Sequence, residues 1–199
     1  MAYADWKPIA GAELVSNAPM AYPTVDATSP GTGTAVLQLR GMSYQTLVSL
    51  NANSQIECWF NLVAGSSQGA AYLTLRAQND SFFGTRYRVV LGTNQPISGI
   101  QRVVSDTAVA LSGVFPLTAP VSALWTKYRF SAVNSADLSA VYLRLEQWRD
   151  GAWLETLTAV DTGATRILTG GYARFGAAEI AGGQTATVNF DDVKAYNLT

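Results

Sequence analysis

Histidine is absent from the sequence, and its absence narrows the chemistry that the 199 residues can perform. Without an imidazole, the chain holds no Ser-His-Asp triad, no Cys-His pair and no histidine-based metal site. The single cysteine, Cys58, cannot form a disulfide within the chain, and its place in an alternating apolar segment predicts a small core residue. We therefore predict no cofactor and no metal site, and any catalysis would depend on carboxylates.

Two glutamates are the remaining candidates for catalysis. Glu146 and Glu155 flank the turn at Asp150-Gly151, and a hairpin closed by this turn pairs residues whose numbers sum to about 301. Two facing carboxylates could serve as acid and base in glycoside hydrolysis. The alternative is a solvated strand face on which Arg144 and Arg149 neutralise them. We favour this alternative and predict that the protein is not an enzyme.

Aromatic and charged residues recur on strand positions that alternate with apolar core positions. If Val141, Leu143 and Leu145 face the core, the residues between them project from the other side of the sheet. The same alternation in segments 56–63 and 71–77 completes the candidate partner-binding residues: Trp59, Tyr72, Arg76, Tyr142, Arg144, Glu146 and Trp148. Such a face suits sugar rings or a protein interface, and a third interpretation is ordinary packing beneath an N-terminal arm or the region 92–124.

The last strand contains a break in its alternation. Val188 and Phe190 share the core face, and strict alternation would next bury Asp192. One extra residue at the Asp191-Asp192 pair returns Val193 to the core, which predicts a β-bulge. The two carboxylates could also supply oxygens to a calcium ion, but two ligands are too few to establish such a site. We favour the bulge without a metal, and the sequence leaves calcium open.

Composition excludes several function classes. Hydrophobic residues make up 48% of the chain and charged residues 14%, which excludes a wholly disordered protein. The net charge of -1 provides no global field for nucleic acid or an anionic membrane, so we predict neither partner. Residues 1–7 lack the basic and apolar regions of a signal peptide, and we expect synthesis in the cytoplasm without export.

Short alternating segments from residue 36 onward predict an all-β sandwich of ten or more strands. The clearest hairpin joins segments 56–63 and 71–77 across the glycine-containing stretch 65–69. Several prolines in residues 1–35 predict an irregular N-terminal arm with one edge strand at Ala12 to Val15. We therefore divide the chain into this arm and a β-sandwich domain at residues 36–199.

Four motifs in the second half follow one another in a recognisable order: Trp125-x-x-Tyr128-x-Phe130, the hairpin at residues 142–153, the glycine-flanked strand at 170–176, and Phe190-Asp-Asp-Val193. Together they resemble the second half of a concanavalin A-like or laminin-G-like jelly roll. The resemblance implies two stacked antiparallel sheets and a concave face that often holds glycans, and some members of the family also bind structural calcium.

The Pro/Ala-rich beginning without a leader looks like that of tailed-phage virion proteins. We accordingly expect a non-enzymatic virion surface protein, a capsid decoration, cement or tail-associated subunit, which is made in the host cytoplasm and resides in the virion. Its expected partners are major capsid or tail subunits and further copies of itself. The alternative is a carbohydrate-binding, lectin-like module that recognises glycans through the aromatic sheet face.

Overall fold

A computed structural model of the chain describes residues 6–9, 20–25, 35–40, 43–62, 69–79, 84–92, 99–113, 124–179 and 187–199. Within these ranges the backbone forms strands and turns and no α-helix. No helix that could cross a membrane is therefore found in the described part of the chain.

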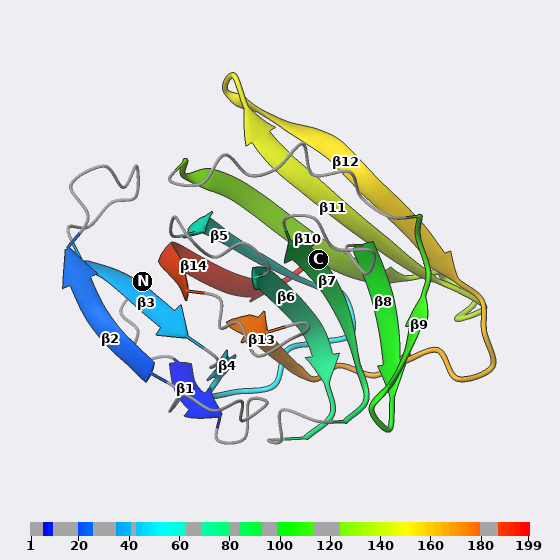
Figure 1. The fold of residues 1–199 in the computed structure, drawn as a ribbon. Helices are drawn as coiled ribbons and strands as arrows, with labels where there is room; N and C mark the ends of the chain where they lie inside the picture. The colour runs from blue at the N-terminus through cyan, green and yellow to red at the C-terminus, as the bar shows by residue number, and fades with distance from the viewer. Residues whose placement is uncertain are drawn as a thin grey trace.

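The described strands form two antiparallel sheets of seven strands each, and the sheets lie face to face (Figure 1). Sheet A contains, in spatial order, β1 (Trp6–Ile9), β4 (Ser43–Thr46), β13 (Tyr172–Glu179), β6 (Gly69–Ala77), β7 (Arg86–Gly92), β8 (Gly99–Val104) and β9 (Thr107–Ala110). Sheet B contains β12 (Ala152–Asp161), β11 (Val141–Arg149), β10 (Thr126–Asn134), β5 (Ser54–Leu62), β14 (Thr187–Asn197), β3 (Ala35–Arg40) and β2 (Met20–Val25). The expected two-sheet antiparallel jelly-roll sandwich is confirmed.

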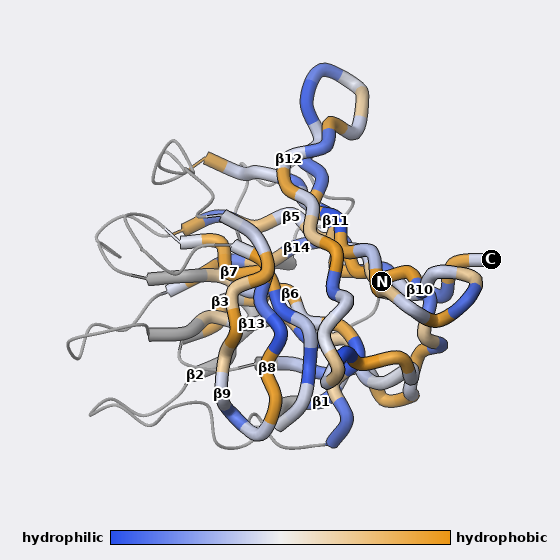
Figure 2. The backbone as a smooth tube through the Cα atoms, turned by 90° about the vertical axis from the view of Figure 1, so that its right-hand side faces the viewer, coloured by the Kyte–Doolittle hydropathy of each residue, from blue (hydrophilic) through white to orange (hydrophobic). Residues whose placement is uncertain are grey.

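The core lies between the sheets because alternate residues of each strand point inward. Phe60 and Tyr128 stack within sheet B at 5.5 Å between ring centroids, and Phe175 of sheet A meets Phe190 of sheet B at 4.9 Å. Cys58 is fully buried beside them, as predicted, and burial raises the pKa of its thiol. Figure 2 shows hydrophobic and hydrophilic residues intermixed along the described strands.

The predicted bulge in the last strand is confirmed. The register between β14 and β5 shifts between Asp191 and Lys194, and Val193 is 1% exposed. Asp192 has a positive φ of 49°, and its backbone N–H donates a hydrogen bond to the Asp191 carboxylate at 2.7 Å. Among the described residues, no group of three or more metal-binding side chains gathers here or elsewhere.

The expected hairpin between β5 and β6 is wrong. β5 pairs with β10 and β14 in sheet B, whereas β6 pairs with β7 and β13 in sheet A. Both are central strands, and the pairing of central strands is set by long-range packing rather than by a local turn signal. Trp59 and Tyr72 consequently lie on different sheets.

Two described segments of the first 35 residues form strands, and each lies at the edge of one sheet. β1 pairs with β4, and β2 pairs with β3. Each of the two contains a proline, which is tolerated at a sheet edge. Trp6 is 5% exposed and packs edge-on against Phe175, so β1 belongs to the core. The segment 12–15, where the strand was predicted, lies outside the described residues.

Candidate functional site

The outer face of sheet B carries its side chains in rows that run across the strands, because paired residues of antiparallel strands point to the same side. One row, which we call the tryptophan row, contains Asp191 on β14, Trp59 on β5, Lys127 on β10, Trp148 on β11 and Trp153 on β12. The next row along the strands, which we call the charged row, contains Glu57, Arg129, Glu146 and Glu155. Together the two rows form the candidate site.

Lys127 occupies the middle of the tryptophan row. Its ammonium lies 5.9 Å from the ring centroid of Trp59 and 5.4 Å from that of Trp153, so it makes cation–π contacts with both rings. The same ammonium lies 3.5 Å from the Glu57 carboxylate. Trp148 meets Trp153 edge-on at 5.3 Å and is 36% exposed. The row therefore presents indole rings on both sides of one cation.

A bidentate ion pair holds the charged row in place. Arg129 donates from Nε and Nη2 to the two carboxylate oxygens of Glu146, at 2.5 and 2.8 Å. The guanidinium also lies 4.5 Å from the ring centroid of Trp153. The hydrogen bond to Glu146 raises the pKa of Arg129. Because Arg129 has both contacts, it fixes the position of Trp153 relative to Glu146.

Tyr196 extends the polar part of this face beyond the β14 bulge. Its hydroxyl accepts a hydrogen bond from Gln55 Nε2 at 2.6 Å and donates to Glu57 Oε2 at 3.2 Å. Burial, and then the Glu57 carboxylate, raise the pKa of the Tyr196 phenol. With the bulge at Asp192 in place, Tyr196 faces the same side of the sheet as Glu57.

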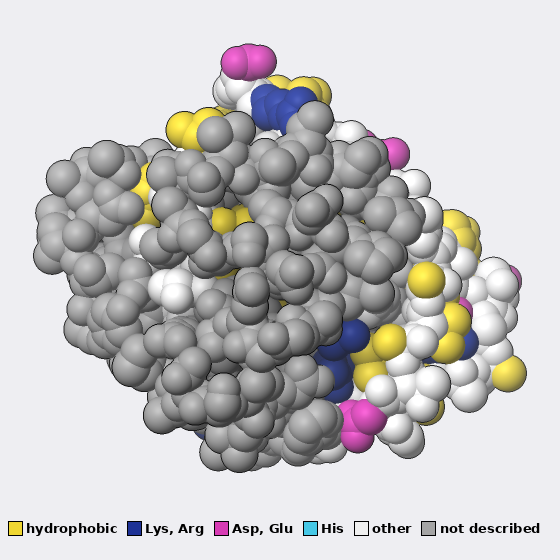
Figure 3. Space-filling model, viewed as in Figure 1, with side chains coloured by type: hydrophobic (Ala, Val, Ile, Leu, Met, Phe, Trp, Pro, Cys, Tyr) yellow, Lys and Arg dark blue, Asp and Glu magenta, His cyan; other side chains and the backbone are white. Residues whose placement is uncertain are grey.

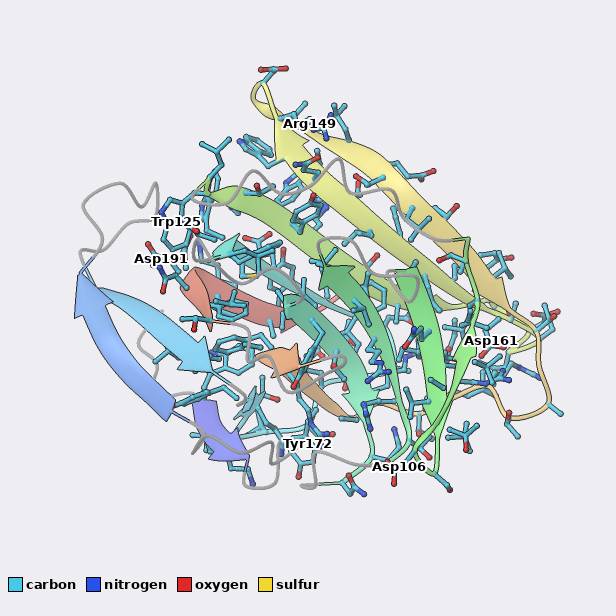
Figure 4. All side chains as sticks on the ribbon, viewed as in Figure 1. Asp106, Trp125, Arg149, Asp161, Tyr172 and Asp191 are labelled. Carbon is cyan, nitrogen blue, oxygen red and sulfur yellow. The ribbon has the colours of Figure 1, made fainter. Side chains whose placement is uncertain are left out.

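The structure brings three of the sequence-predicted site residues together: Trp59, Glu146 and Trp148. Two others lie on the same face but farther along β11. Arg144 pairs with Glu155 at 3.4 Å, and both side chains are more than half exposed. Tyr142 lies opposite Val160, six residues from Trp148, which is about 20 Å along the strand. Arg149 and Asp161 mark the two ends of this hairpin in Figure 4.

The expected positions of Tyr72 and Arg76 on this face are wrong. Tyr72 lies on β6 in sheet A and is only 4% exposed. Arg76 is fully buried, because a register shift between β6 and β13 and a positive φ of 56° turn its side chain inward. A bulge exchanges the two faces of a strand, so simple alternation could not place Arg76 correctly.

Five residues on this face were missed by the sequence prediction: Glu57, Lys127, Arg129, Trp153 and Tyr196. Three signals could have found four of them. The pairing sum of 301 that joins Glu146 to Glu155 also joins Trp148 to Trp153. Core positions at Tyr128 and Phe130 imply that Lys127 and Arg129 point outward. Glu57 follows from its place two residues before Trp59, whereas Tyr196 required the pairing of β14 with β5.

Glu146 and Glu155 are paired across the hairpin, as predicted. Arg129 occupies both oxygens of Glu146, so neither oxygen is free to attack a sugar or pass it a proton. Arg144 pairs with Glu155, as expected. Arg149 does not neutralise either glutamate, because its Nε donates to Gln147 at 2.5 Å. This geometry does not assemble two free carboxylates.

The fold is that of a concanavalin A-like, legume-lectin-like β-sandwich. No protein-family model and no curated protein matches the sequence. Among solved structures, the chain is similar to "Cellulose induced protein, Cip1", with a TM-score of 0.64 and 14% identity over 100% of this chain and 94% of the other. It is also similar to the carbohydrate-binding module CBM66 from Bacillus subtilis, with a TM-score of 0.59 and 12% identity over 97% and 96% of the two chains.

A third similar structure is the exoplasmic/lumenal domain of VIP36 in a form bound to Ca2+ and Man3GlcNAc. Its TM-score is 0.59 and its identity 11%, over 99% of this chain and 86% of the other. At these identities the likeness shows the shared fold alone.

Proposed function

We propose that this protein is a non-catalytic carbohydrate-binding domain that holds a glycan against the tryptophan row. The observation that carries the proposal is the placement of Trp59, Trp148 and Trp153 on one outward sheet face, next to the charged row. Indole rings stack on the apolar faces of sugar rings, and neighbouring charged groups hydrogen-bond the hydroxyls. Two of the similar solved structures support this interpretation of the fold: the carbohydrate-binding module CBM66 and the VIP36 domain bound to Man3GlcNAc.

The fold and the solved structures named above do not support the expected role in a phage particle. The virion location, the capsid or tail partners and the homo-oligomer therefore remain predictions. Mass spectrometry of purified particles from the source of the sequence would test the first two. Light scattering of the purified protein would test the third.

A glycan array tests the proposed function directly. Trp148→Ala removes an exposed ring from the tryptophan row, and we expect it to lower the array signal at least tenfold. Tyr142→Ala is the matched control, because it removes a 52% exposed ring from the same strand and the same face, about 20 Å away. We expect this control to bind like the wild type. An unchanged signal in Trp148→Ala, or no signal from the wild-type protein, would contradict the proposal.

The absence of catalysis is the second part of the proposal. It is supported by the Arg129–Glu146 pair, which engages both oxygens of the carboxylate that would otherwise serve as acid or nucleophile. Incubation of the protein with the glycans that it binds is expected to release no new reducing ends and no unsaturated sugars. Release that is lost in Glu146→Gln would overturn this part of the proposal and leave the binding face intact.

A further inference from the structure

We infer that the ligand is a linear, uncharged glycan that lies across the strands of sheet B, with separate sugar-binding positions at Trp59 and Trp148 and with Lys127 between them. This inference rests on the proposed function and adds the orientation, the minimum length and the charge of the ligand. It follows from the order of the strands and from the ion pairs on the face.

The distance between the two indoles determines the minimum length. Trp59 is on β5 and Trp148 on β11, and β10 lies between these strands. Two strand spacings correspond to about 10 Å, which is more than one stacked sugar ring can cover. A ligand that contacts both rings must therefore contain several linked sugars. It must also run across the strands, because the tryptophan row does.

Lys127 links the two aromatic positions. The register that pairs Tyr128 with Gln147 places Lys127 next to Trp148, and Lys127 is paired directly with Trp59. Among the described residues its ammonium has cation–π contacts and one ion pair, at 3.5 Å with Glu57, so it can turn to donate hydrogen bonds to a sugar above it. The central sugar would thus be held by hydrogen bonds and its neighbours by stacking.

Each cation named on this face has a carboxylate partner. Four cations lie within 4 Å of a carboxylate, in the pairs Lys127–Glu57, Arg129–Glu146, Arg144–Glu155 and Lys194–Asp192. An anionic sugar would have to break one of these pairs and leave its carboxylate without a partner, which is unfavourable where the pair is partly buried. The hydroxyl groups of an uncharged sugar can instead accept and donate hydrogen bonds beside an ion pair that stays intact. The face therefore favours uncharged glycans.

Calorimetric titration with ligands of increasing length tests the inference. The probes are neutral gluco- and manno-oligosaccharides of one to six sugars and uronate oligosaccharides of matched length. We expect the affinity for the neutral series that binds to rise at least tenfold between the monosaccharide and the tetrasaccharide. We expect the uronate series to bind at least tenfold more weakly at equal length. Affinity independent of length, or tighter binding of the uronates, would overturn the inference while the proposed function stands.

Trp59→Ala provides a second readout. We expect it to remove most of the gain from length and to retain the binding of the shortest ligand at Trp148, whereas Trp59→Phe retains part of the gain. A uniform loss at every length would contradict two separate positions. If Trp59→Ala does not fold, the wild-type length series and Trp59→Phe still decide the question. Failure of every glycan, both here and on the array, would overturn the inference together with the proposed function.

Discussion

Arg76 lies between the two sheets with its side chain completely buried. Its guanidinium donates to the carbonyl oxygen of Ala52 and to Asn134 Oδ1, each at 2.8 Å, and to the carbonyl oxygen of Ile167. The ring centroid of Tyr87 lies 5.8 Å from it. Burial lowers the pKa of Arg76 to about 10. The residue thus connects three segments of the chain instead of meeting a ligand.

We predict that Arg76→Ala lowers the free energy of unfolding by about 3–5 kcal/mol, because it leaves one buried and one partly buried carbonyl group and an amide oxygen without their donor. Denaturant unfolding measures the effect. Arg144→Ala is the control, since its partly exposed pair with Glu155 is worth about 1 kcal/mol or less. Equal losses in the two variants would contradict the buried role of Arg76. Glycan binding by folded Arg76→Ala is expected to be unchanged.

At the scale of elements, the bulge in β14 keeps apolar residues in the core on both sides of one extra residue. On one side of it Phe190 packs in the core, and on the other side Val193 does so. Between them Asp192 has one carboxylate oxygen on Lys194 at 2.8 Å, whereas its Oδ1 is buried with no partner in the described part of the chain. The extra residue is therefore not required by the packing around it.

We predict that deletion of Asp192 is tolerated, with a change in unfolding free energy of about 1 kcal/mol or less. The shortened strand alternates regularly, keeps Val193 opposite the core and removes a buried unpaired oxygen. Deletion of Lys194 is the matched control, because it forces either Val193 or Ala195 out of the core whether or not the bulge is kept. We expect it to cost at least about 2 kcal/mol. Urea midpoints with unchanged slopes measure both effects, and the reverse order would refute the prediction.

The two sheets are joined on one side by a buried polar cluster. Asp161, at the end of β12, accepts hydrogen bonds from the Tyr87 hydroxyl at 2.6 Å and from Arg102 Nη1 at 2.5 Å. Tyr87 and Arg102 belong to sheet A, whereas Asp161 belongs to sheet B. The Tyr87 hydroxyl also accepts the backbone N–H of Ile167 at 2.9 Å. Figure 4 shows Asp161 at the opposite end of the β11–β12 hairpin from Arg149. Figure 3 shows charged and hydrophobic side chains exposed at the turn of this hairpin.

We predict that Tyr87→Phe lowers the stability of the whole sandwich by about 1–3 kcal/mol, because it leaves the Ile167 N–H and one Asp161 oxygen without a partner. Tyr142→Phe is the control, since Tyr142 is half exposed. Thermal unfolding measures both variants. Equal midpoints for Tyr87→Phe and the wild type would contradict a role of the cluster in holding the sheets together.

The same tyrosine predicts a dependence on pH. Burial, and then the hydrogen bond to Asp161, raise the pKa of the Tyr87 phenol above its usual value. The phenol is protonated in both states below pH 10, and above about pH 10 it ionises first in the unfolded chain. The wild type is therefore expected to lose stability as the pH rises above 10. Tyr87→Phe is expected to lose less over the same range, and parallel losses would contradict the assignment.

Much of this architecture was predictable from local patterns. Alternation predicted the all-β sandwich and the outward positions of Trp59 and Trp148. The Asp150-Gly151 turn predicted the register of the β11–β12 hairpin as far as Glu146, beyond which a bulge shifts it by one residue. The break at Asp191 predicted the bulge because it conflicts with alternation inside a single strand. Arg76 was misplaced because the bulge in β6 disturbs no obvious apolar pattern in its own strand, so it is detectable only through the partner strand β13.

The sequence by itself determined which side chains of each strand can face water, because the two faces of a strand alternate with a period of two residues. Only the tertiary structure decided which strands are neighbours. It separated β5 from β6, placed β10 between Trp59 and Trp148, and brought Lys127 and Arg129 next to the indoles. Pairing between distant strands depends on the packing of the entire core, and no local segment encodes it. The candidate site is therefore a property of the assembled sheet.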